Sequence, residues 1–413
     1  MMNSTEQILV YLLSAAIRGE KVQKDKIQNI NWEAILEQAK EQNIYSIIYP
    51  IIKDLDTHHR PENNIIDQWK KQTILTGINQ QRNINQMGLV LASFNKENIP
   101  VIGLKGLILR EFYPQKELRT MSDVDLLIQE KNLDKSRKVL LSMGYSEDEK
   151  DLKHIVFSNK DHLPIELHWA LIDSGHFKHA EYLEDDIWKN TNKINIYGAT
   201  VLTPSIENQI LHLCLHMVTH FVYSGFGLRQ LCDLVLFVES EINRIDWNSF
   251  YNKVKRCKIE KFTFAIFEIC RRFFDMDVPN ILYDKNLKDN KYVDMIEESI
   301  ISKGAFEGVF GKESFESFSP ELLLYCESNE SSKKNFEKIR NFLRFLFPSL
   351  PKMIERYEYV DRYNILLPIA WTHRIIHGIM RKDISMNEKS TLLLSDSNIL
   401  QERAKLFKWL DLQ

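Results

Sequence analysis

The sequence has few cysteines, no long apolar run and little net charge, and each feature excludes a class of protein. The cysteines are scattered without C-x-x-C spacing, which argues against a disulfide framework or a zinc site and predicts buried thiols in a reducing compartment: Cys214, Cys232, Cys257, Cys270 and Cys326. No run reaches the roughly 18 apolar residues of a membrane-spanning helix. The formal charge of −3 gives no general attraction to nucleic acid or to an anionic membrane.

The composition is that of a globular protein. The chain has 413 residues, of which 44% are hydrophobic and 27% charged, so it is long enough for two or three domains. In the N-terminal stretch, Glu6, Arg18 and Glu20 flank a short apolar run, which predicts an amphipathic helix and not a signal peptide. We therefore expect a cytoplasmic protein that does not bind a membrane.

The spacing of apolar residues changes twice and divides the chain into three predicted domains, at 1–98, 99–204 and 205–413. The first and third place apolar residues three and four apart, as helices do. The middle segment holds strand-like stretches and a helix that ends at Gly144. The expected strands are 99–104, 122–128 and a hairpin of 154–159 with 163–169. We predict an α+β fold, mostly helical overall, with a small mixed-sheet core between two helical domains and a long loop at 302–320.

Three acidic side chains interrupt apolar strands of the predicted core. Asp123 and Asp125 stand two apart in SDVDLLI, so their side chains lie on one face of a strand. Glu166 stands between Ile165 and Leu167 in PIELHW. Adjacent ionised carboxylates repel one another and need a cation, and Mg²⁺ binds a few carboxylates together with substrate phosphates. The three acids therefore predict a site for Mg²⁺ or Mn²⁺, in which Glu166 holds metal or acts as a general base.

Basic residues near these acids are candidates for binding a triphosphate. Lys105 and Gly106 form a turn before a predicted helix, where a glycine lets the backbone approach a phosphate and a lysine adds a point charge. Arg119 either binds phosphate or forms an ion pair with a nearby carboxylate. Arg229 lies four residues before Asp233 on a predicted helix, and it either pairs with Asp233 or meets the nucleotide. The role of Asp233 stays open.

Four histidines have open roles. His168 shares a strand face with Glu166 and either orients that carboxylate or contacts substrate. His212, His216 and His220 recur every four residues on one predicted helix, a spacing that invites a zinc interpretation. No cysteine or acid nearby completes a ligand set, so packing or pocket lining is the preferred interpretation.

Taken together, GLKG, LRTMSDVDLLI, IELHW, LHLCLHMVTHF and LRQLCDL resemble the bacterial uncharacterised nucleotidyltransferase family of the polymerase-beta-like superfamily. Later, LFPSL, RY and LLPIAWTHRI resemble the tail of that family. The resemblance implies an enzyme that transfers a nucleoside monophosphate from an NTP to an acceptor and releases pyrophosphate, with Asp123, Asp125 and Glu166 as metal ligands. The superfamily turn is Gly-Ser or Gly-Gly, whereas this chain has Lys105-Gly106, so the resemblance implies where the triphosphate binds but not how this turn holds it.

Two other functions compete with this one. The first is a non-catalytic nucleotide- or peptide-binding module on a degenerate core, and the second is an RNA-modifying toxin that acts on tRNA ends. A site without activity has no reason to keep three clustered carboxylates at a desolvation cost, and the negative net charge argues against RNA. We expect a small-molecule or peptide acceptor ahead of nucleic acid. The patterns specify neither the acceptor, nor the NTP, nor the oligomeric state.

Overall fold

The protein is described here by a computed structural model covering residues 4–150, 153–172, 178–223, 225–287, 290–301, 347, 350, 353, 357–380 and 405–412. The described residues belong to two compact units, one within 1–217 and 227–304 and the other within 218–226 and 305–413. The division into three domains stays a prediction, and the predicted loop at 302–320 lies outside the described residues.

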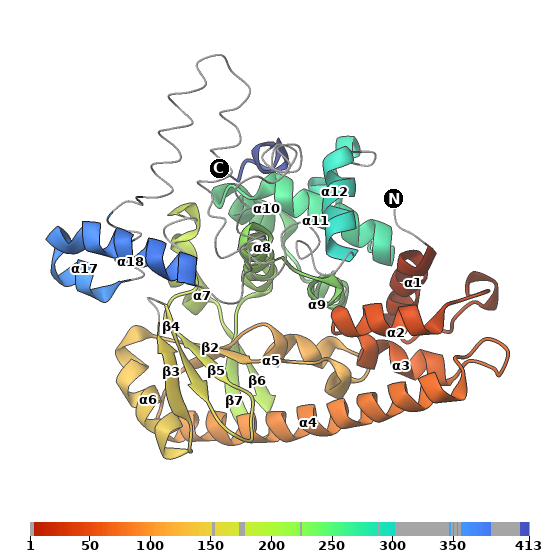
Figure 1. The fold of residues 1–413 in the computed structure, drawn as a ribbon, viewed down its shortest axis with the longest axis horizontal. Helices are drawn as coiled ribbons and strands as arrows, with labels where there is room; N and C mark the ends of the chain where they lie inside the picture. The colour runs from red at the N-terminus through yellow and green to blue at the C-terminus, as the bar shows by residue number, and fades with distance from the viewer. Residues whose placement is uncertain are drawn as a thin grey trace, which may run out of the picture. The chain divides into compact units, whose positions relative to one another are not determined.

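In the described part of residues 1–98, all regular structure is helical, as predicted. Asn31 caps the second helix, because its side chain accepts a hydrogen bond of 3.1 Å from the backbone N–H of Ala34. The last of these helices, α4, is the long orange one at the bottom of Figure 1. The α-helices are α1 (Ser4–Arg18), α2 (Trp32–Glu41), α3 (Tyr45–Lys53) and α4 (Asn63–Lys96).

A mixed sheet follows, with strand order β3-β4-β5-β2-β1-β7-β6. Two neighbouring pairs are parallel, β2 with β5 and β1 with β7, and the other pairs in the sheet are antiparallel. The predicted α+β fold class is therefore confirmed. The strands are β1 (Val101–Gly103), β2 (Val124–Ile128), β3 (Ser146–Lys150), β4 (His154–Ser158), β5 (Ile165–His168), β6 (Asn192–Ile196) and β7 (Ala199–Thr203).

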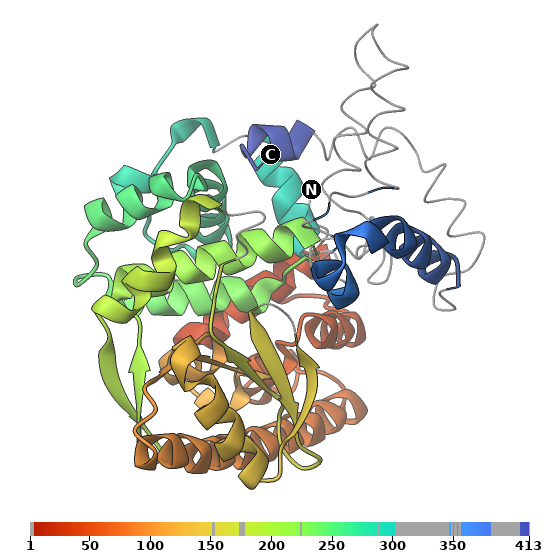
Figure 2. The same ribbon diagram turned by 90° about the vertical axis from the view of Figure 1, so that its left-hand side faces the viewer.

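One face of this sheet is buried in a hydrophobic core. Val124, Leu126 and Ile128 of β2 alternate with residues of the other face and pack with Phe94 of α4 and Leu140 of α6 (Leu133–Ser142). Figure 2 shows α4 in orange and α6 in yellow-orange beside the strands. Because strand side chains alternate, Asp125 points to the face opposite to this core.

The predicted strands were too few. The edge strand β3 reads SEDEK and shows no apolar alternation, so its sequence carries no strand pattern. The hairpin of β6 and β7 turns at Tyr197 and Gly198, which have φ values of 48° and 85°. Two positive φ values in succession are typical of the tightest hairpin turns, and a tyrosine there is uncommon.

Helices return after the sheet. In the first unit these are α7 (Tyr182–Lys189), α8 (Ile206–Tyr223), which extends into the second unit, α9 (Leu228–Glu241), α10 (Trp247–Arg256), α11 (Glu260–Phe274) and α12 (Lys291–Ile301). The second unit includes α17 (Glu358–Arg362) and α18 (Leu367–Met380), whose small core contains Met353, Val360 and Ala370. Among the described helices, none is long and apolar enough to cross a membrane.

Candidate active site

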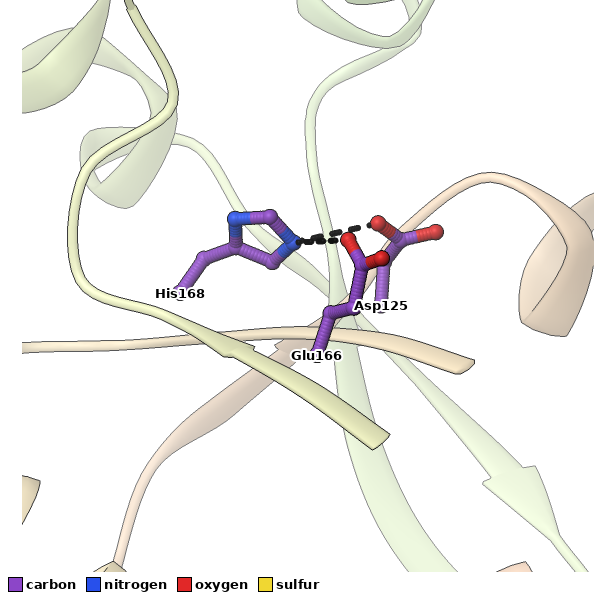
Figure 3. Close-up of side chains that lie close together, drawn as sticks. All are labelled: Asp125, Glu166 and His168. Atoms are coloured by element: carbon purple, nitrogen blue, oxygen red, sulfur yellow. Dashed lines mark hydrogen bonds and ion pairs between the residues drawn. The ribbon is translucent and has the colours of Figure 1, made fainter. Parts of the chain in front are cut away.

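Asp125 and Glu166 lie side by side on neighbouring strands. β2 and β5 run parallel, and their register places Asp125 directly opposite Glu166. His168 follows two residues later on β5, so its side chain lies on the same face as Glu166. Figure 3 shows the three side chains converging, with His168 reaching both carboxylates. The sheet thus brings together residues that lie far apart in the sequence.

The predicted strand of 122–128 included Asp123. In the structure β2 begins at Val124, so Asp123 lies just before the strand. The strand pairing begins at Val124, whose N–H donates to the carbonyl of Pro164 at 2.9 Å, and residues 122 and 123 form a bend. Burial raises the pKa of Asp123, and the charges of Asp125 and Glu166 raise it further. Asp123 is therefore a carboxyl group whose ionised form gains from an added cation.

Asp125 is the most deeply buried acid of the site, with a side chain 4% exposed. Its Oδ1 accepts a hydrogen bond of 2.6 Å from Nζ of Lys105 and lies 3.1 Å from Nε2 of His168. Burial by itself would raise the pKa of Asp125, but Lys105 and His168 outweigh it and hold the pKa well below its usual range. Asp125 is thus a fixed negative charge.

Within the described residues, one group has the spacing of a metal site: Asp125, Glu166 and His168, with one ligand atom of each within 4.8 Å of the others. His168 Nε2 also lies 3.3 Å from Oε2 of Glu166. Burial lowers the pKa of His168, but hydrogen bonds to the two carboxylates outweigh this effect, so the pKa is raised overall. His168 contacts both acids, so the structure agrees with the first of the two roles considered from the sequence, contact with Glu166, and adds a contact with Asp125.

The turn of Lys105 and Gly106 lies between β1 and the short helix α5 (Gly106–Leu109). Lys105 has φ 44° and ψ −124°, a conformation that favours glycine. Gly106 is buried, and a Cβ atom at this position would overlap the guanidinium of Arg119. The phosphate contact that the sequence suggested for this glycine stays a prediction, and the structure shows that Arg119 packs closely against the glycine.

Arg119 and Asp233 form a buried ion pair between the segment before β2 and helix α9. Nη2 of Arg119 lies 2.5 Å from Oδ2 of Asp233, and the two side chains are 7% and 5% exposed. Tyr113 donates a further hydrogen bond of 2.8 Å to Oδ1 of Asp233. The partner of Arg119 is therefore a distant aspartate and not the carboxylates considered from the sequence. Nucleotide binding by Arg119 stays a prediction.

Arg229 also contacts the segment before β2. Its Nη1 donates to the carbonyl of Thr120 at 2.9 Å and to the hydroxyl of Thr120 at 3.1 Å. Burial lowers the pKa of Arg229, and the charge of Arg119 lowers it further. Asp233, the i,i+4 neighbour considered from the sequence, is instead held by Arg119 and Tyr113. Neither Thr120 nor Tyr113 was singled out in the sequence, since each is an isolated polar residue without a motif of its own.

His212 of helix α8 interacts electrostatically with the site. Its side chain is 6% exposed, and burial together with the charge of Lys105 lowers its pKa to about 3. The rings of His212 and His216 stack with their centroids 6.4 Å apart. His212 is thus a neutral side chain near Lys105, Asp125 and His168, the three groups whose charges act on it.

Comparison with known proteins gives two findings. A family model described as uncharacterised nucleotidyltransferase matches residues 28–275, a range that contains every residue of the site. The solution structure of the antibiotic-resistance factor ANT(2″)-Ia is similar over 43% of this chain and 96% of that chain, with 15% identity and a TM-score of 0.31. No curated protein matches the chain.

Proposed function

Because the chain belongs to the uncharacterised nucleotidyltransferase family, we propose that Asp123, Asp125 and Glu166 form a metal-dependent site for nucleotidyl transfer. The reaction moves the nucleoside monophosphate group of an NTP to an acceptor and releases pyrophosphate. Residues 99–204 are the proposed core of this enzyme, and the segments 1–98 and 205–413, predicted to be helical, flank it in the sequence.

The observation that supports this proposal most is the pairing of Asp125 with Glu166 across two parallel strands. Two carboxylates in register on one sheet face, with Asp123 just before the same strand, concentrate negative charge. Such a cluster costs desolvation energy, so a fold that keeps it needs a compensating cation. Lys105 and His168 offset part of this charge, yet the pKa of Asp123 stays raised by burial and by its acidic neighbours.

The donor set fits a divalent metal ion. Carboxylate oxygens are the ligands that Mg²⁺ and Mn²⁺ prefer, and an imidazole nitrogen is a frequent ligand for the transition metals. The ligand atoms of Asp125, Glu166 and His168 are close enough to share one ion. A divalent ion bound there would neutralise charge on the triphosphate and on the pyrophosphate that leaves.

The different exposures of Asp125 and Glu166 suit different roles in the reaction. Asp125 is 4% exposed and hydrogen-bonded, which suits a fixed ligand, whereas Glu166 is 28% exposed and can meet an acceptor. In the proposed step the acceptor oxygen attacks the α-phosphorus, and its proton goes to Glu166. The bond from the α-phosphorus to the bridging oxygen breaks, and pyrophosphate leaves with that electron pair. Lys105 is placed to bind a phosphate oxygen of the leaving group.

Replacement of Asp125 by asparagine tests the site. The amide keeps the shape of the side chain but removes the charge that holds metal, so the affinity for an NTP with Mg²⁺ is expected to fall at least about tenfold. Isothermal titration calorimetry with and without Mg²⁺ measures this change. The matched control is Asp134→Asn, because Asp134 is 87% exposed on α6 and its loss should leave binding unchanged. Equal Mg²⁺-dependent affinity in wild type and Asp125→Asn would sink the proposal.

The acceptor proposed is a small molecule or a peptide, and the proposed location is the cytoplasm. The net charge of −3 supports an acceptor other than nucleic acid. A non-catalytic module is expected to bind NTP without transferring label to any acceptor, so the two functions differ in a labelled-NTP assay.

A further inference from the structure

We propose that Lys105 is an exchangeable cation of the site: it occupies Asp125 in the absence of nucleotide, and it moves to the triphosphate when a divalent ion takes its place. This inference rests on the proposed function and adds a rule for the order of events. A divalent ion alone must compete with a tethered ammonium group, whereas an ion that arrives with a triphosphate brings new partners for that ammonium.

The first support is the position of Nζ. It lies 2.6 Å from Oδ1 of Asp125, the same oxygen that lies 3.1 Å from Nε2 of His168, and Asp125 and His168 both belong to the group with metal-ligand spacing. The charges of Asp125, Glu166 and Asp123 all act on Lys105. An ammonium and a metal ion on the same oxygen compete, because two cations so close together repel each other.

The second support is the backbone of Lys105. The turn is fixed on one side by Leu104, whose N–H donates to the carbonyl of Asp125 at 3.2 Å, and on the other by the first turn of α5. Between them Lys105 has φ 44°, where a glycine would be relaxed and a lysine is strained. A strained residue at a functional site indicates that its side chain supplies something a glycine cannot, and here that is the ammonium group.

The third support is the exposure of the two partners. The side chain of Lys105 is 23% exposed and that of Asp125 is 4% exposed. The aspartate is therefore nearly inaccessible in the sheet, whereas part of the lysine side chain reaches solvent. A lysine has a flexible four-carbon stem and a point charge that accepts different geometries, so it can pass from a carboxylate to a phosphate oxygen.

The exchange predicts opposite effects of one substitution. Lys105→Met removes the competing cation, so the affinity for Mn²⁺ alone is expected to rise about ten- to a hundredfold, the range that one charge-assisted hydrogen bond represents. The same variant loses the phosphate contact. The ratio of its affinity for a non-hydrolysable NTP analogue with Mn²⁺ to its affinity for Mn²⁺ alone is therefore expected to be lower than in wild type. Electron paramagnetic resonance counts free Mn²⁺, and calorimetry follows the analogue.

Two further variants keep the test decisive. Lys105→Met leaves buried Asp125 with His168 but without its ammonium partner and can unfold the chain, whereas Lys105→Gly removes the amine and also relieves the positive φ. Both variants are expected to gain thermal stability from Mn²⁺ alone, more than wild type does. Lys116→Met is the control, since Lys116 pairs with Glu111 at 2.8 Å in an exposed ion pair. That control should bind Mn²⁺ as wild type does.

The outcomes separate the two proposals. Tighter Mn²⁺ binding in Lys105→Met and Lys105→Gly, with weaker relative binding of the analogue, supports the exchange. Mn²⁺ affinity that is equal in wild type and in these variants overturns the exchange but leaves a metal site in place. Absence of Mn²⁺ binding from wild type and variants alike overturns the proposed function together with the exchange.

Discussion

Replacement of Glu166 by glutamine is expected to keep most of the affinity for metal and nucleotide but to slow nucleotidyl transfer by about 10²- to 10⁴-fold, the usual contribution of a general base. The reason is the division of exposure between the acids: Asp125 is buried and held by Lys105, whereas Glu166 is 28% exposed and open to an acceptor. An amide can still offer its carbonyl oxygen to a metal ion, but it cannot take up the acceptor proton.

The measurement is an acceptor screen with α-labelled NTPs, run on wild type and Glu166→Gln side by side. Small molecules and peptides form the main panel, and tRNA is included to test the toxin interpretation. Asp123→Asn is the comparison variant, because it is expected to lose binding and transfer together. Transfer that is equally fast in wild type and Glu166→Gln would mean that the base lies elsewhere.

Replacement of Asp233 by alanine is expected to lower the free energy of unfolding by about 3–5 kcal/mol. Asp233 and Arg119 are both nearly inaccessible, and Tyr113 donates to the same carboxylate. Removal of the aspartate leaves the Arg119 guanidinium buried without its counter-charge, and desolvation of that charge is costly. The expected loss exceeds that of an ordinary surface substitution.

Urea unfolding of wild type and Asp233→Ala measures this loss. Glu111→Ala is the matched control, since Glu111 and its partner Lys116 are 37% and 44% exposed and such pairs contribute about 0–1 kcal/mol. The double variant Arg119→Met with Asp233→Leu is expected to recover much of the stability, because apolar residues of similar volume can replace a buried ion pair. A loss in Asp233→Ala no larger than in Glu111→Ala would show that the pair is not essential to the fold.

The strand pattern was sufficient to place Asp125 and Glu166 on strands, but it wrongly included Asp123, which precedes β2. Val124, Leu126 and Ile128 alternate with Asp125, and Ile165 and Leu167 alternate with Glu166, so each apolar set predicts the face on which its acid lies. The register between the two strands is not written in either segment, because it depends on the loops and helices that join them. The structure supplies it by pairing Asp125 with Glu166.

The partners of the basic residues could not be predicted in the same way. Arg119 and Asp233 are 114 residues apart in the sequence, and their contact depends on where helix α9 packs in the fold. The nearby acids that sequence distance favours were the wrong partners for this arginine. Lys105 was predicted to bind phosphate, but its ion pair with Asp125 becomes visible only when the turn after β1 is placed against β2. Local spacing predicts neighbours along one element and does not predict contacts between elements.

The most direct test of the metal site is anomalous diffraction at the manganese edge, from crystals grown with Mn²⁺ and a non-hydrolysable NTP analogue. The expected result is Mn²⁺ bonded to carboxylate oxygens of Asp123, Asp125 and Glu166, within reach of Nε2 of His168, with the triphosphate on the same ion and Lys105 on a phosphate oxygen. A Mn²⁺ peak away from these carboxylates, or a nucleotide bound at another face of the sheet, would contradict it.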